Sequence, residues 1–483
     1  MIRMTLADFH RIRTRRDFLD RCLGGLGVAS LAHLLSIEGR TAATDPGTSN
    51  SLAPRKPHFE APAKNVIFLF QAGAPSQMDL FDPKPGLRKW HGKSLPESLT
   101  RDLELAFVKP SAKVMASPRV FKRHGESGIE ICDWLPHTAE VVDDICLIRS
   151  MYSDAFNHHP GQSLLMSGHT LMGRPTLGAW VTYGLGSESR DLPGFVVLSS
   201  GRGTSGGASN WSSGFMPSTY QGVVFRGSGD PILYLSNPGG VDRKMQRADL
   251  DALRALNEER YRTTGDREIA SRIASYELAF RMQAAAPGLL DFSDEPAHIR
   301  EMYGIDEELT KPYGTNCLLA RRMVERGVRF VMLAHASWDD HSNLNKRLEK
   351  NCGITDKPAA ALIRDLKQRG LLDSTLVVWG GEFGRTPMAE IRRPEEVEKA
   401  GRDHHPKGYS MWLAGGGIKG GQVIGKTDEV GLSIVEDKIG IHDLQATILH
   451  CLGFDHTRLT YRHLGRDFRL TDVGGNVVRK MLA

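Results

Sequence analysis

Short, largely apolar runs that end in polar residues recur along this chain. The run Val66–Phe70 leads into Gly73 and two aspartates, while Val328–Leu333 and Thr375–Trp379 each follow a helical pattern that a glycine closes. Such runs are typical of strands buried on both faces, and their alternation with helices predicts a parallel sheet. The apolar stretch Tyr409–Ala414 predicts another strand. We therefore expect an α/β fold, a three-layer sandwich around a mostly parallel central sheet.

A different pattern occupies residues 192–310. The Gly/Ser-rich stretch 199–215 predicts a surface loop, and the apolar spacing of 248–287 predicts a pair of helices. A stripe of Leu, Ala and Met in these helices is typical of packing. We expect this region to form an insertion or cap on a domain that spans residues 65–483.

Positive charge is concentrated at the N-terminus. The first 40 residues hold seven arginines against three aspartates and one glutamate, which is +3 of the formal net charge of +5. The rest of the chain is close to balanced. No nucleic-acid partner is therefore expected.

The same segment is typical of an export signal. Arg15 and Arg16, in "TRRDFL", precede a modest apolar run, Cys22–Leu35, that glycines interrupt and that is too short to span a bilayer. This arrangement resembles a twin-arginine signal, and an amphipathic N-terminal helix is the alternative. We expect a signal peptide at 1–43, a linker at 44–64, the twin-arginine translocase as export partner, and a periplasmic or extracellular protein without a stable membrane span.

The six cysteines show no CxxC spacing, which argues against a zinc knuckle or a redox pair. Removal of Cys22 with the signal would leave five. We therefore expect mainly buried free thiols.

Acidic and imidazole side chains follow the predicted strands. In α/β sheets ligands bind beyond the carboxyl ends of the strands, so we expect these side chains to share one polar site. Mixtures of this kind suit a divalent metal such as Zn, Mn, Fe or Ca, but they also form ordinary hydrogen-bond networks. The candidates, from five segments, are Asp79, His158, His159, Asp339, His341, Glu382, Asp403 and His404.

Several motifs resemble those of a large family of exported bacterial proteins, a domain of unknown function grouped with the alkaline phosphatase and sulfatase superfamily. They are "GAPSQMDLFDPKP", "NHHPGQ", "SWDDHSN", "WGGEFGRTP", "GRDHHPKGYSMWLAGGGIKGG" and "HDLQATILHCLGFDH". The resemblance runs from about Asn65 to the C-terminus. It implies an alkaline-phosphatase-like fold.

The wider superfamily also suggests roles. The sulfatase run "CSPSRAALLTG", laid on "HHPGQSLLMSG", puts His158 at the nucleophile position. The paired aspartates expected after the first strand are here Gln71 and Ala72, and the later Asp-His or Asp-Asn pair is Glu382-Phe383. The chain thus departs from the superfamily pattern at its metal positions.

The resemblance implies an exported, metal-dependent hydrolase of sulfate or phosphate esters, on small molecules or polysaccharides. His158 is expected to act as nucleophile, general acid or ligand, Arg385 and Arg402 to grip an anionic group, and His159 and Gln77 to contact substrate. A non-catalytic glycan-binding or assembly protein with the same fold is the alternative. The expected metal ligands are Asp79, Asp339, His341, Glu382, Asp403 and His404.

Other chemistries find little support. The stretch "GGGIKGG", Gly415–Gly421, lacks the ending of a phosphate-binding loop and predicts a tight turn, and no nucleophile elbow is present.

Near the C-terminus we expect an amphipathic helix with Leu444, Ile448 and Leu452 in the core.

Overall fold

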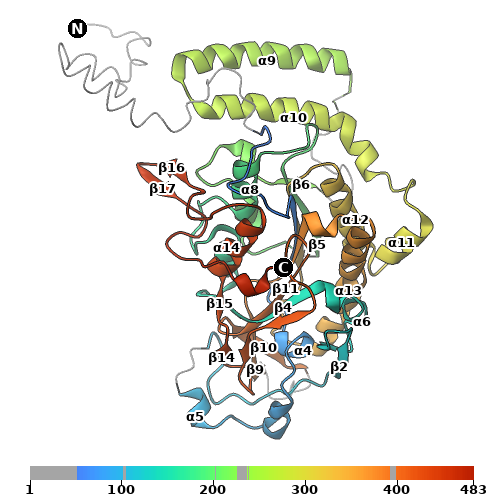
Figure 1. Ribbon diagram of the computed structural model, residues 1–483, viewed down its shortest axis with the longest axis vertical. Helices are drawn as coiled ribbons and strands as arrows, with labels where there is room; N and C mark the ends of the chain where they lie inside the picture. The colour runs from blue at the N-terminus through green and yellow to red at the C-terminus, as the bar shows by residue number, and fades with distance from the viewer. Residues whose placement is uncertain (1–51, 102–104, 202, 226–236, 238, 392–398) are drawn as a thin grey trace, which may run out of the picture. The chain divides into compact units, whose positions relative to one another are not determined.

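The computed structural model describes residues 52–101, 105–201, 203–225, 237, 239–391 and 399–483 (Figure 1). The predicted signal peptide at 1–43, with Arg15, Arg16 and Cys22, lies outside these residues, as does the first part of the linker. From residue 55 the linker follows the domain surface, where Arg55 N–H donates to Leu185 O and Ala63 N–H to Cys451 O.

In the described part of the chain, nine strands form one central sheet. Their order is β12-β4-β11-β8-β1-β7-β5-β6, with β15 also beside β4. Every pairing is parallel except those of β11 with β4 and β8, so the predicted mostly parallel sheet is confirmed. The strands are β1 (Asn65–Ala72), β4 (Ile145–Tyr152), β5 (Phe195–Gly201), β6 (Val223–Phe225), β7 (Phe330–Ala336), β8 (Thr375–Gly380), β11 (Tyr409–Ala414), β12 (Gln422–Ile424) and β15 (Ile439–Gly440).

Helices cover both faces of this sheet. Along β1 the side chains alternate: Ile67 and Leu69 join the core on one face, and Val66, Phe68 and Phe70 join the core on the other. The predicted three-layer sandwich is thereby confirmed. The first core takes α12 (Lys311–Glu325) and α13 (Leu344–Gln368), and the second takes α7 (His158–Ser167), α8 (Leu177–Leu185) and α14 (Ile441–Cys451).

The predicted helix ends also agree with the structure. Gly327 and Gly370, just beyond α12 and α13, have φ of +82° and +68°, a conformation that glycine adopts without a steric penalty. Leu444, Ile448 and Leu452 of the C-terminal segment are buried, as predicted. The five described cysteines are all buried and free.

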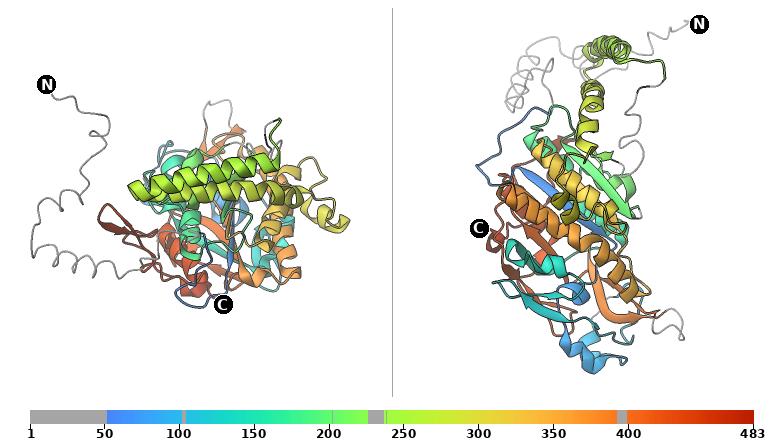
Figure 2. Two further views of the ribbon diagram at one scale, coloured as in Figure 1. Left: turned by 90° about the horizontal axis from the view of Figure 1, so that it is seen from above. Right: turned by 90° about the vertical axis from the view of Figure 1, so that its right-hand side faces the viewer.

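The region 192–310 begins inside the sheet, because β5 and β6 lie within it. Val196–Leu198 is an apolar run that the sheet buries completely. Beyond it, α9 (Arg243–Thr264) and α10 (Arg267–Leu290) form the predicted helical pair, visible as two adjacent long helices in Figures 1 and 2. Helix α9 buries none of its described residues, whereas α10 buries Ala286 and Leu289 near its end.

Smaller elements complete the chain. No described helix combines the length and apolar composition that crossing a bilayer requires. The remaining elements are α4 (Gln77–Leu80), η1 (Pro85–Trp90), α5 (Glu97–Thr100), β2 (Phe121–His124), β3 (Ile129–Cys132), α6 (Pro136–Ala139), η2 (Val142–Asp144), η3 (Gly207–Trp211), η4 (Ser218–Tyr220), α11 (Ala297–Tyr303), η5 (Leu372–Ser374), β9 (Gly384–Glu390), β10 (Gly401–His405), β13 (Lys426–Thr427), β14 (Ile434–Glu436), β16 (Tyr461–His463), β17 (Arg466–Phe468) and η7 (Arg479–Met481).

The strand directions bring distant loops to one edge of the sheet. Strands β1, β4, β5, β7 and β8 are mutually parallel, so their carboxyl ends lie on the same side. Strand β11 runs the other way and begins at that edge. The segment before β11 therefore meets the loops that follow the parallel strands.

Candidate metal centre

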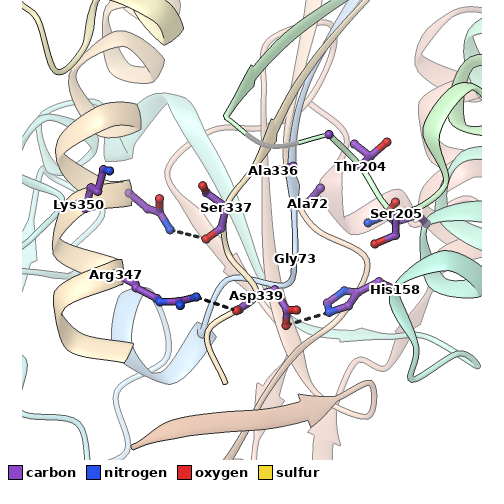
Figure 3. Close-up of a pocket in the computed structure, with 13 residues that line it drawn as sticks. Ala72, Gly73, His158, Thr204, Ser205, Ala336, Ser337, Asp339, Arg347 and Lys350 are labelled. Atoms are coloured by element: carbon purple, nitrogen blue, oxygen red, sulfur yellow. Dashed lines mark hydrogen bonds and ion pairs between the residues drawn. The ribbon is translucent and has the colours of Figure 1, made fainter. Parts of the chain in front are cut away.

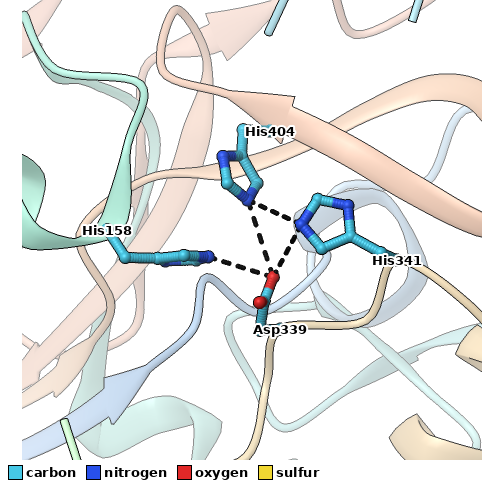
Figure 4. A group of neighbouring side chains, drawn as sticks. All are labelled: His158, Asp339, His341 and His404. Carbon is cyan, nitrogen blue, oxygen red and sulfur yellow. Dashed lines mark hydrogen bonds and ion pairs between the residues drawn. The ribbon is translucent and has the colours of Figure 1, made fainter. Parts of the chain in front are cut away.

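Four side chains from three of these segments converge at the carboxyl edge of the sheet (Figure 4). His158 is the first residue of α7, which follows β4; Asp339 and His341 follow β7; and His404 lies in β10, just before β11. One donor atom from each lies within 4.8 Å of the others, so the group could hold a metal ion. The structure thus brings the segments that hold Asp339, His341 and His404 to one edge of the sheet.

The three imidazoles surround one carboxylate oxygen. Asp339 Oδ1 lies 3.0 Å from His158 Nε2, 2.9 Å from His341 Nε2 and 3.5 Å from His404 Nε2. The Nε2 atoms of His341 and His404 are themselves 3.0 Å apart. All three rings therefore point the same kind of atom at one centre.

The outer nitrogen of each ring faces an acceptor. Nδ1 of His158 lies 2.7 Å from Glu382 Oε1, Nδ1 of His341 contacts a Glu390 carboxylate oxygen, and Nδ1 of His404 lies 2.7 Å from the Phe156 carbonyl oxygen. These oxygens only accept, so each ring donates from Nδ1. A neutral ring then carries its lone pair at Nε2, toward the centre.

In that tautomer the inner nitrogens, the Nε2 atoms, carry lone pairs and have no proton to donate. His158 Nε2 is buried, and its contact with Asp339 Oδ1 at 3.0 Å is a hydrogen bond only when this nitrogen carries a proton. Facing lone pairs repel unless a cation, either a proton or a metal ion, lies between them. Histidines that donate from the outer nitrogen to a carboxylate or carbonyl and point the inner one at a common centre are typical metal ligands.

The electrostatics of the group also favour a cation. Burial alone would lower the pKa of His158, but hydrogen bonds to Asp339 and Glu382 raise it to about 9. For His341 burial again acts downward, and contacts with Asp339 and Glu390 raise its pKa overall. Burial would raise the pKa of Asp339, yet hydrogen bonds from the three histidines hold it well below its usual range. The carboxylates thus stabilise positive charge at this point.

A second group, His341, Glu390 and Asp403, also has donor atoms within 4.8 Å. Both oxygens of Asp403 already accept backbone N–H groups, from Phe107 at 2.7 Å and from His404 at 2.7 Å. We therefore assign Asp403 to loop positioning rather than to a second metal ion. The Phe107 ring, held by this contact, lies edge-on to His341 and His404 with centroids 5.6 and 5.4 Å away.

Glu382 lies behind His158 rather than beside the other inner atoms. It is fully buried and accepts from Gln162 Nε2 at 3.1 Å and from the Gly73 N–H at 3.1 Å. The Phe383 ring stacks on His158, with centroids 5.1 Å apart. These contacts fix the orientation of the imidazole.

Asp79 and Arg402, both predicted as site residues, lie against each other. Arg402 Nε donates to Asp79 Oδ2 at 2.8 Å, and both side chains are almost completely buried. Burial would raise the pKa of Asp79, but the guanidinium lowers it below its usual value. The structure does not bring this pair into the four-residue group, because each satisfies the other's charge.

Arg385 is buried among backbone carbonyls. Its Nε donates to Ala74 O at 3.0 Å, Nη1 to Arg402 O at 3.0 Å, and Nη2 to Asp339 Oδ1 at 2.8 Å. The Gln77 side chain hydrogen-bonds the Arg385 backbone twice: its Nε2 donates to the Arg385 carbonyl oxygen and its Oε1 accepts from the Arg385 N–H, each at 2.8 Å. The residues predicted to bind substrate here thus connect the loops of the site. His159, next to His158, is half-buried and belongs to neither metal-binding group.

A cavity of about 410 Å³ adjoins the group (Figure 3). His158 and Asp339 form part of its wall, and half of the Asp339 side chain is exposed. Arg347 and Lys350 of α13 line another side. The four-residue group is therefore accessible to a ligand.

Sequence reasoning missed four of these residues. Gln162 lies one helical turn after His158, a spacing that could have indicated it. Arg347 and Lys350 are surface positions in an amphipathic helix, where basic residues are ordinary. Glu390 carries no local signal, since its place depends on how β9 pairs with β10.

A family model described as a protein of unknown function (DUF1501) matches residues 63–482. The chain belongs to this family. The predicted membership in a domain of unknown function is confirmed, whereas the twin-arginine signal stays a prediction. No curated protein matches the chain.

Solved structures of similar chain path include members of the alkaline phosphatase and sulfatase superfamily. The lipoteichoic acid synthase LtaP from Listeria monocytogenes is 10% identical with a TM-score of 0.37, over 84% of this chain and 76% of that one. The PsFucS1 sulfatase from Pseudoalteromonas sp. is 13% identical with a TM-score of 0.34, over 89% and 71%. A protein of the alkaline phosphatase superfamily from Vibrio parahaemolyticus is 10% identical with a TM-score of 0.32, over 89% and 76%. At this level of similarity, function has to be argued from the side chains.

Proposed function

We propose that this protein is an exported, metal-dependent hydrolase of sulfate or phosphate esters. His158, Asp339, His341 and His404 hold the metal ion. Three imidazoles and one carboxylate form a donor set that suits Zn²⁺, and also Fe or Mn. A bound divalent ion would supply Lewis-acid stabilisation of the charge that develops on an ester oxyanion.

The observation that carries the proposal is the direction of the three rings. Each imidazole donates from Nδ1 to a fixed acceptor and turns its Nε2 toward Asp339 Oδ1. Three inner nitrogens that converge on one carboxylate oxygen need either separate protons or one metal ion between them, and a single metal ion satisfies all of them at once. The adjoining cavity gives the centre the access that a hydrolase needs.

This geometry favours one of the three roles open to His158. Its Nδ1 is occupied by Glu382, and its Nε2 lies 3.0 Å from Asp339 Oδ1, at the common centre. A nucleophile needs a free lone pair facing substrate, so we assign His158 as a ligand. Arg385 positions the loops around the centre, through its contacts with Ala74 and Asp339.

Elemental analysis of protein exported by its native route, combined with turnover of 4-nitrophenyl phosphate and sulfate, tests the proposal. We expect one transition metal per chain and hydrolysis of at least one ester. His158→Ala should lose both metal and activity, whereas His159→Ala, the matched control, should keep the metal. Trapping of a phosphohistidine or sulfohistidine adduct in the parent would show instead that His158 is the nucleophile.

Metal binding without turnover of either ester would favour the alternative, a non-catalytic protein that holds a glycan in the same cavity. Export by the twin-arginine translocase is part of the proposal and rests on Arg15 and Arg16. That route carries folded proteins, so the metal could be inserted before export.

A further inference from the structure

The cavity beside the four-residue group is larger than the ester group alone requires. Its volume of about 410 Å³ falls in the range of pockets that enclose a whole small molecule. His158 and Asp339 lie at one end of it, as Figure 3 shows. A ligand whose ester reaches the metal would therefore also fill the space beyond.

One side of that space is cationic. Arg347 and Lys350 lie one turn apart on α13 and both line the cavity. Within the described part of the chain, the Arg347 side chain makes a long contact with the Asp339 carbonyl oxygen, at 3.4 Å, and a loose ion pair with Asp340, at 3.7 Å. Among the described residues Lys350 shows no ion pair. Once Asp339 is bound to a metal ion, no other carboxylate among the described residues lines the cavity, so Arg347 keeps its loose pair with Asp340 and Lys350 faces no counter-charge there.

The opposite side presents hydroxyl groups. Figure 3 shows Thr204 and Ser205 facing Arg347 and Lys350 across the cavity. Thr204 Oγ1 accepts a hydrogen bond from Asn210 Nδ2 at 3.0 Å, so its own proton remains available to an acceptor in the cavity.

This loop is held by the same residue that supports the metal centre. Gln162 Oε1 accepts from the Gly206 N–H at 3.1 Å and from Asn210 Nδ2 at 3.0 Å, while its Nε2 donates to Glu382. The hydroxyl side is therefore fixed relative to the metal centre. Donors line both sides of the cavity.

From this arrangement we infer that the substrate carries a second anionic group, a carboxylate or another sulfate or phosphate. Arg347 and Lys350 bind that group while the ester lies at the metal centre. The inference rests on the proposed function, because it assigns the ester to the four-residue group. It narrows the substrate class from anionic esters in general to small molecules or glycan units with at least two negative charges.

Two phosphonates of equal length test the inference by calorimetric titration of the metal-loaded full chain. Butylphosphonate carries one anionic group, and 4-phosphonobutyrate carries the same phosphonate with a carboxylate at the far end. The C–P bond keeps both intact. We expect 4-phosphonobutyrate to bind roughly threefold to tenfold more tightly, a modest factor because the two cations are partly exposed to solvent.

Lys350→Gln and Arg347→Gln should each reduce this preference, and the double variant should abolish it while butylphosphonate affinity stays the same. Lys346→Gln, which removes the same charge from an exposed position of α13 outside the cavity lining, is the matched control and should keep it. Equal affinity for the two phosphonates, binding of neither, or a preference that survives the double variant would overturn the inference. Failure to hydrolyse aryl esters would remove the proposed function but would leave this preference measurable.

Discussion

Glu382 offers a sharp test of the metal centre, because it touches the centre only through His158. Its carboxylate is fully buried and accepts from His158 Nδ1 at 2.7 Å, Gln162 Nε2 at 3.1 Å and the Gly73 N–H at 3.1 and 3.3 Å. Glu382→Gln keeps the shape of the side chain but removes the charge and one acceptor oxygen. His158 then loses the partner that fixes its ring and raises the basicity of its inner nitrogen.

Loss of such an outer partner weakens metal binding by about 10-fold to 100-fold, which corresponds to about 1.4 to 2.7 kcal/mol. We expect Glu382→Gln to lie in this range in a zinc competition titration with a chromophoric chelator. Glu390→Gln should act in the same direction, because Glu390 is the outer partner of His341. Aryl ester turnover at saturating zinc should recover in part in both variants.

Glu349→Gln provides the control for charge. Glu349 is exposed on α13 and lies in neither metal-binding group, so its removal should leave zinc affinity within about twofold. Circular dichroism of each variant establishes that the fold is intact. If zinc affinity is the same in Glu382→Gln, Glu390→Gln and Glu349→Gln, the three rings do not converge on a metal ion.

Other predictions concern stability and export. Burial lowers the pKa of His335 to about 4, below the value of about 6.5 in the unfolded chain, so acid favours the unfolded state. This effect reduces the free energy of unfolding by about 2 kcal/mol between pH 7 and pH 5. In urea unfolding, His335→Asn should therefore lose less stability over this pH range than the parent protein. An equal loss in the variant would contradict this. Asp79→Ala leaves Arg402 as an unpaired buried cation and should lower the free energy of unfolding, measured in urea, by about 3 to 5 kcal/mol. A loss below about 1 kcal/mol, as for an exposed pair, would contradict this. Replacing Arg15 and Arg16 by lysine should retain the precursor in the cytoplasm, as cell fractionation would show; unchanged export would reject the twin-arginine route.

The strands could be predicted because their information is local. Val66–Phe70, Val328–Leu333 and Thr375–Trp379 are largely apolar runs that the sheet buries on both faces, and each predicted range overlaps a strand. The strand direction of Tyr409–Ala414 could not be predicted from its sequence, because an apolar run is equally compatible with parallel and antiparallel pairing. Its antiparallel course follows from pairing with β4 and β8.

That direction changes the reason for one prediction. The sequence places His404 after one predicted strand, Thr375–Trp379, and before another, Tyr409–Ala414, and the structure shows that the second of these runs antiparallel to the first. The two descriptions place it at the same edge of the sheet. The outer partner Glu390 shows the limit more plainly: it lies 49 residues from His341, and only the pairing of β9 with β10 brings it there.

The same dependence on distant pairing explains why a buried arginine, Arg385, lies against the centre. Asp339 and His341 follow β7, and His404 arrives through β10, so no single element holds the ligands together. Arg385 supplies the missing connection: one guanidinium binds the Ala74 carbonyl after β1, the Arg402 carbonyl in β10 and the Asp339 carboxylate after β7. A planar group with five donors can satisfy carbonyls from three directions, which a lysine cannot do. Arg385, which the resemblance assigns to gripping an anionic group in catalysis, is therefore in this fold the residue that holds the ligand loops at metal-binding distance.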